Sequence, residues 1–401
     1  MIWDRYRHLA HTGKLSPTSM TATNNLQTPL YDLHLEAGAR LVEFGGWQMP
    51  VQYQGIIAEH KAVRGGVGMF DVSHMGKFVV RGQNVLERLQ GLVPSNLGRL
   101  AAGQAQYTVL LNEQAGIIDD VIFYRHEDQG DQEYWTVIVN AATTGKDYTW
   151  LKRFLGDDLA DHSPELLLLA VQGPAVIATL GQLDDSGTIS KSISDKSISE
   201  TLTKLPRFGH TELMLYGVKA FVARTGYTGE DGVEIMIPVA EGRQLWQDLL
   251  GFGVVPCGLG CRDTLRLEAG MHLYGQDMDE QTTPLEADLG WLIHWSEKDD
   301  FMGREILTQQ KQQGLTRKLV GLTLTGRNIA RHDYPILDSQ TGATIGTVTS
   351  GTLSPTLGYP VAMGYVPASM AQVGQSLQVQ IRQQVFGATV VKRPFYRPTQ
   401  L

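Results

Sequence analysis

The chain has 401 residues, of which 42% are hydrophobic, and its formal net charge at pH 7 is -8. This length allows two or three domains that each bury a core, and the apolar content excludes a chain that is disordered throughout. The negative balance disfavours nucleic acid or an anionic membrane as a partner, so we expect small molecules or proteins instead.

The N-terminal segment, residues 1–27, has no apolar core of the signal-peptide kind, and we interpret it as a flexible extension. Met20 is a second possible start. Residues 1–19 carry three basic residues and a single acid, which leaves a mitochondrial transit peptide as the alternative to a cytoplasmic protein. No apolar run reaches the length that spans a membrane.

Residues 106–126, QYTVLLNEQAGIIDDVIFYRH, predict a hairpin, because two runs of branched and aromatic residues flank the connection NEQAG. Alternation along the second strand places Asp119 and Asp120 on opposite faces, each beside apolar side chains. An acid in such a place is costly unless it is paired, so one of the two is expected to have a specific role. An edge-strand acid that discourages aggregation is the alternative.

The next predicted strand, EYWTVIVNAA, ends at Asn140 and runs into TTGKDYTWLKRFL, where Thr143 or Thr144 is expected to cap a helix. Binding side chains collect at the ends of strands. Asn is also a common strand terminator, so both interpretations of Asn140 stay open.

Residues 224–235, RTGYTGEDGVEI, combine three glycines with hydroxyls, an aromatic ring and three carboxylates. Glycine permits a left-handed backbone and the close approach of other groups. The stretch therefore predicts a hairpin turn between the apolar run that ends at Ala223 and the strand-like EIMIPV, with a ligand cradle as the functional alternative.

Residues 258–280, GLGCRDTLRLEAGMHLYGQDMDE, are predicted to form a helix after a Gly-rich turn, with Leu265, Ala269 and Leu273 on one face. Arg262 stands where the helix dipole is positive, so we expect it to have an assigned partner in the protein or in a ligand. GLG lacks the third glycine of a dinucleotide fingerprint and the chain has no Walker-type lysine motif, which argues against a nucleotide phosphate site.

The remaining regions carry no predicted chemistry. Cys257 and Cys261, the only cysteines, are too few for a four-thiolate zinc site, and we expect reduced packing residues. Residues 184–204 are Ser-rich and polar without a clear period, which indicates a surface insertion. From about Lys318, short strand-like runs between Gly and Pro predict a compact all-β module.

Seven motifs follow one another across nearly the whole chain from Thr28. They are TPLYDLHLEAGARLVEFGGWQMPVQY, VGMFDVSHMGKF, YTVLLNEQAGIIDD, VQGP, RTGYTGEDGVE, GLGCRDTLRLEAGMHLYGQDMDE and TSGTLSPTLGY. This ordered series resembles the T-protein family of the glycine cleavage system, the aminomethyltransferases.

The resemblance implies an α+β fold in which three domains form a cloverleaf around a central folate pocket. Two would be α/β domains with antiparallel sheets, and the third a C-terminal β-barrel or jelly-roll-like domain. We expect two interleaved α/β domains over residues 28–317, with about 76–163 forming most of one, and the barrel over residues 318–401.

The resemblance also implies a reaction. The family transfers the one-carbon unit from the aminomethyl-dihydrolipoyl arm of H-protein to tetrahydrofolate, and the products are 5,10-methylenetetrahydrofolate, ammonia and dihydrolipoyl H-protein. Tetrahydrofolate is a co-substrate and the chemistry needs no metal. The expected partners are therefore lipoylated H-protein and folate, without nucleic acid or a membrane.

Roles follow from the motif positions. The resemblance makes Asp120 the catalytic carboxylate beside the folate nitrogens, with Asp119 as the fallback, because one-carbon transfer creates cationic character and moves protons. Glu234 corresponds to the carboxylate that binds the paired N–H donors of the pterin. The other expected pocket residues are Arg262, Tyr107, Asn140 and Tyr227. In the C-terminal KRPFYRP, the basic residues Lys392, Arg393 and Arg397 are expected either in a solvated tail or at the folate carboxylates or H-protein.

Three other polar residues are expected to be ordinary. Glu230 and Asp231 are interpreted as solvated turn residues of the Gly-rich stretch. His74, in VGMFDVSHMG, is interpreted as a hydrogen-bonded histidine in a tight turn before a strand rather than as a catalytic base.

Two other functions would keep the same fold. A folate-sensing protein of the iron-sulfur maintenance type carries a cysteine in its KGCYxGQ signature, whereas this chain has GMHLYGQ. A folate-dependent demethylating oxidase joins the fold to a flavin domain, and this sequence has no dinucleotide fingerprint. The transferase is therefore the favoured function.

Overall fold

The computed structural model of the protein describes residues 25–185 and 197–398. The choice between Met1 and Met20, the possible transit peptide and most of the predicted N-terminal extension lie outside the described residues. So does the middle of the predicted insertion, residues 186–196. In the described part of the chain, no helix is both long and apolar enough to cross a membrane.

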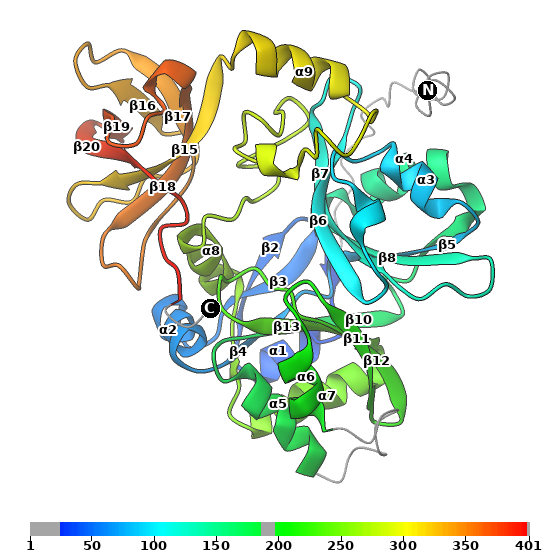
Figure 1. Ribbon diagram of the computed structural model, residues 1–401. Coiled ribbons are helices and arrows are strands. Elements are labelled where there is room, and N and C mark those ends of the chain that lie inside the picture. The colour runs from blue at the N-terminus through cyan, green and yellow to red at the C-terminus, as the bar shows by residue number, and fades with distance from the viewer. Residues whose placement is uncertain (1–24, 186–196, 399–401) are drawn as a thin grey trace.

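The chain folds into three lobes, and each is built on its own sheet (Figure 1). Two lobes are mixed helix and sheet structures with mainly antiparallel sheets, and the third is a closed six-stranded barrel. The predicted α+β fold with a C-terminal barrel is confirmed. The exact limits of the domains stay a prediction.

The first lobe contains a six-stranded sheet in the order β11-β12-β13-β10-β4-β14, antiparallel except for the pair β14 and β4. Its strands are β4 (Gly68–Asp71), β10 (Leu166–Gln172), β11 (His210–Leu215), β12 (Val218–Ala223), β13 (Gly232–Pro238) and β14 (Val255–Pro256). The central strand β10 is a continuous apolar run, LLLLAVQ, because both faces of the sheet are covered.

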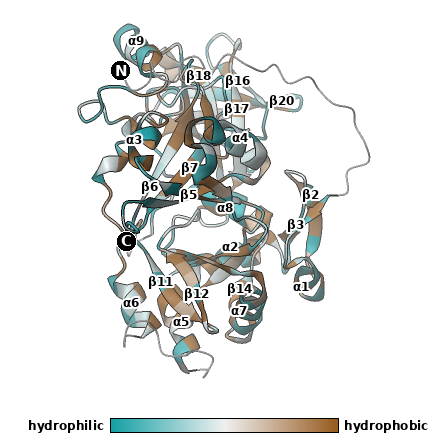
Figure 2. Cartoon of the chain, turned by 90° about the vertical axis from the view of Figure 1, so that its right-hand side faces the viewer, coloured by the Kyte–Doolittle hydropathy of each residue, from teal (hydrophilic) through white to brown (hydrophobic). Residues whose placement is uncertain are grey.

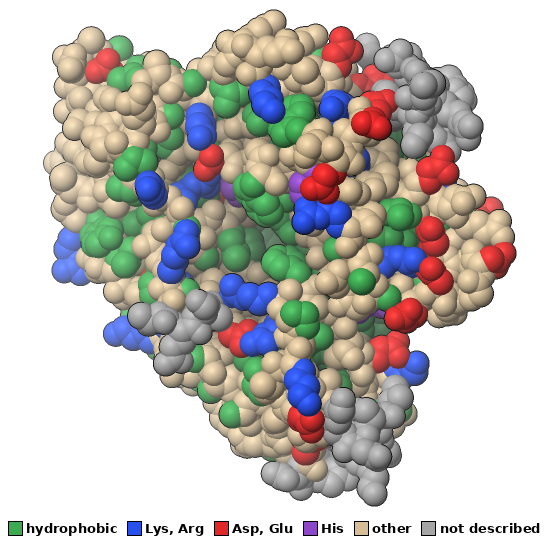
Figure 3. Space-filling view, in the orientation of Figure 1, with side chains coloured by type: hydrophobic (Ala, Val, Ile, Leu, Met, Phe, Trp, Pro, Cys, Tyr) green, Lys and Arg blue, Asp and Glu red, His purple; other side chains and the backbone are tan. Residues whose placement is uncertain are grey.

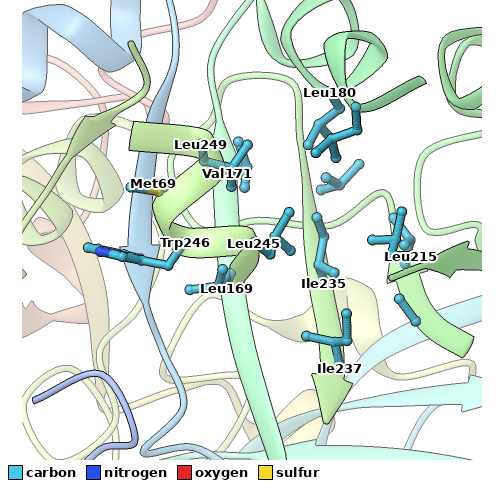
Figure 4. Close-up of a cluster of buried hydrophobic side chains, with 14 of the residues drawn as sticks. Met69, Leu169, Val171, Leu180, Leu215, Ile235, Ile237, Leu245, Trp246 and Leu249 are labelled. Atoms are coloured by element: carbon cyan, nitrogen blue, oxygen red, sulfur yellow. The ribbon is translucent and has the colours of Figure 1, made fainter. Parts of the chain in front are cut away.

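The core on one face of this sheet fills the space beneath α7 (Val239–Gly251) and α5 (Val176–Asp185). Figure 4 shows Leu169 and Val171 of β10 and Ile235 of β13 in the same cluster as Trp246 of α7. The opposite face packs against α8 (Leu259–Glu268), where Cys257 and Cys261 are buried free thiols within the core. The interpretation of the two cysteines as reduced packing residues is confirmed.

The second lobe contains a five-stranded antiparallel sheet in the order β6-β7-β8-β5-β9. Its strands are β5 (Gly76–Gly82), β6 (Gln104–Leu111), β7 (Ile117–Arg125), β8 (Glu133–Val139) and β9 (Leu159–Asp161). The predicted hairpin is β6 and β7, with Val109 opposite Asp120. Val121 and Phe123 face a core beneath α3 (Val85–Gln90) and α4 (Thr144–Leu155).

The third lobe is the closed barrel, in the order β15-β18-β17-β16-β19-β20. Its strands are β15 (Arg317–Leu324), β16 (Pro335–Asp338), β17 (Thr344–Leu353), β18 (Pro360–Pro367), β19 (Ser376–Ile381) and β20 (Gln384–Val391). α9 (Arg304–Gln313) precedes it. Closure leaves no free sheet edge.

A small sheet stands at one side of the first lobe. It consists of β1 (Leu26–Gln27), β2 (Arg40–Phe44) and β3 (Trp47–Gln52), with α1 (Tyr31–Glu36) between β1 and β2. Figure 2 shows β2, β3 and α1 together at the edge of the molecule, while the strands of the larger sheets are mostly apolar. α2 (Ile56–Gly65) then returns the chain toward α8.

The helix predicted over residues 258–280 is shorter than expected, because α8 ends at Glu268. Gly270 follows with φ of 70°, a left-handed conformation that favours glycine. Its N–H donates to the Leu267 carbonyl oxygen (2.9 Å) and the Met271 N–H donates to that of Arg266 (2.9 Å). These two bonds form a Schellman motif, which stops the helix before Leu273.

The interpretation of residues 184–204 as a surface insertion is wrong at its end, where residues Ile198–Lys204 form α6. Ser197 caps this helix, since its Oγ accepts a hydrogen bond from the Glu200 N–H (3.1 Å). Ile198 and Leu202 are buried in the core of the first lobe. The sequence does contain the signal of a helix, an N-cap Ser197 followed by the apolar Ile198 and Leu202 four residues apart, but the Ser-rich composition around it indicated an insertion.

We expect Ser197→Ala to destabilise α6 by about 1 kcal/mol, because the Glu200 N–H loses its acceptor. Local opening should then expose the α6 amides roughly fivefold more often, which hydrogen exchange measures. Thr203→Ala is the matched control, since it removes a hydroxyl bonded to the Ser199 carbonyl oxygen and leaves the cap intact. Equal exchange rates in the two variants would contradict the capping role.

Candidate active site

A cavity of about 840 Å³ opens at the centre of the molecule and is lined by residues of the first two lobes, of the small sheet and of the segment that follows the barrel. Figure 3 shows this hollow with apolar side chains inside it and Lys and Arg side chains around it. Six of the seven predicted site residues line the cavity: Tyr107, Asp120, Asn140, Tyr227, Glu234 and Arg262. Arg397 is exposed and does not belong to the lining, whereas Arg393 of the same C-terminal segment does.

Asp120 faces the cavity from β7. Its Oδ2 accepts a hydrogen bond from the Tyr107 hydroxyl (3.1 Å) and its Oδ1 accepts one from Asn140 Nδ2 (2.8 Å). Burial, together with the negative charge of Asp119, raises the pKa of Asp120 to about 7. An acid with this pKa both releases and accepts a proton near neutral pH, which suits it to general acid and base chemistry.

Asp119 points the other way, into the core of the second lobe, and is fully buried. Its carboxylate accepts hydrogen bonds from the Asn140 N–H (3.0 Å) and from Asn140 Nδ2 (2.9 Å). Asn140, at the end of β8, therefore bridges the two acids, and its side-chain N–H groups are already used in hydrogen bonds to them. The alternation predicted for the two acids is the one observed.

Glu234 reaches the cavity from β13, opposite Ala223 of β12. Its Oε2 accepts a hydrogen bond from the Thr225 hydroxyl (2.5 Å). Within the described residues, no hydrogen bond reaches the other oxygen, Oε1. A half-buried carboxylate with a free oxygen can accept hydrogen bonds from a ligand.

Arg262 lies in the first turn of α8. Its guanidinium carbon is 4.5 Å from the centre of the Tyr227 ring, and the Tyr227 hydroxyl donates to the His272 carbonyl oxygen. Arg262 Nη1 is buried and has no hydrogen-bond partner among residues 25–185 and 197–398. A buried donor without an acceptor is unfavourable, so this atom marks a place for an acceptor group of a ligand.

The Gly-rich stretch is the connection between β12 and β13, as predicted. Only Gly229 of its three glycines has a left-handed φ, 81°. Gly226 and Gly232 instead pack against Gln172, where an added Cβ would lie 1.9 Å and 2.4 Å from side-chain atoms. Two of the glycines are therefore required by close packing rather than by the turn.

The prediction that Glu230 and Asp231 are solvated is wrong. Glu230 is 8% exposed and its Oε1 pairs with Arg64 Nη1 (2.8 Å), while Asp231 accepts two hydrogen bonds from Arg224 (2.9 and 2.6 Å). Arg64 Nη2 also pairs with Glu268 Oε2 (2.8 Å). Glu268 in turn accepts from the Thr356 N–H (3.1 Å), so this network ties the Gly-rich loop to the barrel.

Trp291 lines the cavity and was not predicted, whereas Arg393 belongs to the basic C-terminal segment considered from the sequence. Trp291 is 63% exposed and stacks on Tyr107, with ring centroids 6.2 Å apart and an interplanar angle of 23°. Arg393 pairs with Asp288 (2.9 Å), and both line the cavity. Trp291 lies in no recognisable sequence pattern, because the position of an exposed tryptophan at a cavity depends on how the lobes are placed around it.

His74 also lines the cavity, in a turn before β5, and the expectation that it is hydrogen-bonded is wrong. Its Nδ1 is buried and has no partner in the described part of the chain. Burial mainly, with the positive charges of Arg262 and Lys77, lowers the pKa of His74 to about 4. The imidazole is therefore neutral and its edge meets the rings of Phe44 and Trp47.

The described residues contain one group of potential metal ligands, Glu59 with Cys257 and Cys261, and it lies outside the cavity lining. The Glu59 carboxylate already accepts backbone hydrogen bonds from Tyr53 (2.6 Å), Gly55 (3.0 Å) and Gly258 (2.9 Å). Burial raises the pKa of the Cys261 thiol. A carboxylate used in this way and a protonated thiol make a poor metal site.

Comparison with known families gives two matches along the chain. The family described as "GCVT N-terminal domain" matches residues 30–297, and the one described as "Glycine cleavage T-protein C-terminal barrel domain" matches residues 317–397. The second match covers nearly the same residues as the barrel strands β15 to β20.

Several known proteins are similar over nearly their whole length. A Nostoc protein named aminomethyltransferase is 54% identical over 381 residues, which is 94% of this chain and 97% of that one. One from Thermosynechococcus vestitus is 55% identical over 92% of this chain and 95% of its own. The crystal structure of the glycine cleavage system aminomethyltransferase T from Bartonella henselae superimposes with a TM-score of 0.83 at 35% identity, covering 94% and 99% of the two chains.

Proposed function

Because the chain belongs to the glycine cleavage T-protein family of aminomethyltransferases, we propose that its central cavity is where the one-carbon unit passes to tetrahydrofolate. The protein is an aminomethyltransferase of the glycine cleavage system. We propose further that the donor is the aminomethyl-dihydrolipoyl arm of H-protein. Three features of one cavity support this proposal: an acid poised near neutral pH, a free carboxylate oxygen and an unpartnered arginine donor.

The proposed transfer exchanges two bonds for two. The bonds from carbon to sulfur and from carbon to the amine nitrogen break, and two bonds from carbon to folate nitrogens form. The two folate N–H protons end on ammonia and on the lipoyl sulfur, so atoms and charge balance. Asp120 accepts a proton from the attacking nitrogen in its carboxylate form and returns it to a leaving group, while its charge stabilises the cationic carbon.

The cavity also has groups that suit a pterin. The free Oε1 of Glu234 can accept from the paired N–H donors of the pterin, and Arg262 Nη1 can donate to a ring acceptor. Tyr107 and Tyr227 offer rings beside it. We keep Arg397, exposed on the C-terminal segment, as a proposal for the carboxylates of the folate tail, with Arg393 nearer to the cavity.

We propose a cytoplasmic location, which the bacterial origin of the similar proteins supports. Division of the chain into residues 28–317 and 318–401 is likewise a proposal, and the family matches at residues 30–297 and 317–397 support it.

An assay of methylenetetrahydrofolate and ammonia formation from aminomethylated H-protein tests the proposed function. We expect turnover that requires both tetrahydrofolate and the loaded H-protein. Binding of folate without turnover, in the presence of an H-protein that a known T-protein accepts, would overturn the proposal.

The pH dependence of this turnover is a further prediction. Because Asp120 acts as a carboxylate, we expect the rate to fall as the pH drops through about 7, where Asp120 takes up a proton. Asp119→Asn removes the neighbouring charge that raises this pKa, so the acid limb should move to lower pH by roughly one unit. Rate measurements across pH with saturating substrates check this shift, and an unmoved limb would contradict it.

A further inference from the structure

Asp147 is a buried acid that the proposed mechanism does not use. It lies in the first turn of α4 and is fully buried. In the described part of the chain, neither of its oxygens accepts a hydrogen bond. An ionised carboxylate in such a place would be strongly destabilised.

The charged and polar groups around Asp147 are committed elsewhere. Lys146 Nζ donates to the Ile118 carbonyl oxygen (2.8 Å), to the Tyr274 hydroxyl (2.9 Å) and to Glu280 Oε1 (2.7 Å). The Tyr274 hydroxyl donates to the Ile117 carbonyl oxygen (3.1 Å), and the Thr143 hydroxyl to that of Asn140 (3.0 Å). Burial and the charge of Asp119 raise the pKa of Asp147 and outweigh the Thr143 hydroxyl and the charge of Lys146, which act to lower it.

Another acid, Asp119, lies within hydrogen-bonding reach of Asp147. Two carboxyl groups share a hydrogen bond only if one of them holds a proton. Asp119 already accepts two hydrogen bonds from Asn140, which stabilise its ionised form. The proton of the pair therefore belongs to Asp147. Burial and the charge of Asp119 support this order, since they raise the pKa of Asp147 to about 9.

We propose that Asp147 is a positioning residue: as a neutral carboxylic acid it donates a hydrogen bond to Asp119, and Asp119 then holds the Asn140 amide against Asp120. Asn140 Nδ2 lies 2.9 Å from Asp119 Oδ1 and 2.8 Å from Asp120 Oδ1, so a shift of Asp119 is felt at Asp120. The positioning role rests on the proposed function of Asp120. The protonation state of Asp147 does not.

Infrared difference spectroscopy tests the protonation state without any substrate. The spectrum of wild type minus Asp147→Asn is recorded at a pH between about 7 and about 9, where Asp120 has lost its proton and Asp147 has kept it. We expect a carbonyl band of a protonated carboxylic acid that the variant lacks. Carboxylate bands in its place would overturn the inference, whatever the activity of the enzyme.

Turnover across pH tests the positioning role. Asp147→Asn keeps a donor toward Asp119, so we expect the acid limb of the wild type. Asp147→Ala removes the donor, which makes Asp119 harder to ionise and weakens its repulsion of Asp120, so the limb should move to lower pH by roughly one unit. Equal limbs in both variants would refute positioning. A purely structural role would lower the yield of folded Asp147→Ala but leave its acid limb at the pH of the wild type. If the acid limb is lost in Asp120→Asn but does not move in Asp147→Ala, the positioning role fails while the proposed function of Asp120 stands.

Discussion

Asp120→Asn is expected to lower turnover by a factor of roughly 10²–10⁴ while tetrahydrofolate binds with nearly unchanged affinity. Asparagine has the shape of aspartate, so Tyr107 and Asn140 keep partners at this position. It cannot accept a proton near neutral pH and carries no charge to stabilise a cationic carbon. The change therefore removes chemistry and leaves the cavity intact.

Single-turnover measurements with aminomethylated H-protein, beside calorimetry with tetrahydrofolate, separate the two effects. Asp119→Asn is the matched control, because it removes a neighbouring acid that faces the core instead of the cavity. We expect the control to retain turnover above its shifted acid limb. Turnover of Asp120→Asn equal to that of wild type would sink the assignment of Asp120, and equal losses in both variants would show that the acids act as one unit.

The location of Asp120 could be predicted because it depends on local rules. Side chains alternate along a strand, and the connection NEQAG fixes the hairpin, so Asp119 and Asp120 had to face opposite ways. Which of the two faces of β7 borders the cavity depends on where the other parts of the chain lie around it. The family resemblance predicted that Asp120 and Glu234 face the pocket, and both side chains line the same cavity.

Partners that are distant in the sequence could not be predicted. Glu230 pairs with Arg64, 166 residues away, and no local pattern marks such a contact. Asp147 stands in the first turn of α4, where an acid ordinarily serves the helix dipole at the surface. Its burial near Asp119 depends on how α4 packs on the sheet of the second lobe. The Ser-rich composition also led to a wrong prediction at α6, because the serines around its N-cap gave this helix the composition of a surface insertion.

Glu234→Gln is expected to weaken tetrahydrofolate binding by roughly 5- to 15-fold, because a charge-assisted contact contributes about 1.5–3 kcal/mol and a neutral one about 0.5–1.5 kcal/mol. The Gln oxygen can still accept from the Thr225 hydroxyl, so the loop keeps its conformation. In Gln, the atom that faces the cavity is either an uncharged oxygen or the NH2 group of the amide. An amide N–H at this place would face the N–H donors of the pterin and could not accept a hydrogen bond from them.

Calorimetry with tetrahydrofolate measures this loss, and Glu36→Gln is the matched control, since Glu36 is an exposed acid of α1 outside the cavity lining. Both variants lose one negative charge, so a difference between them reports the contact rather than the net charge. Turnover at saturating folate should fall far less than in Asp120→Asn, because Glu234 holds the ligand and Asp120 moves the proton. Equal affinities in Glu234→Gln and Glu36→Gln would remove Glu234 from the pterin site, and a loss of turnover that folate cannot restore would make it part of the chemistry.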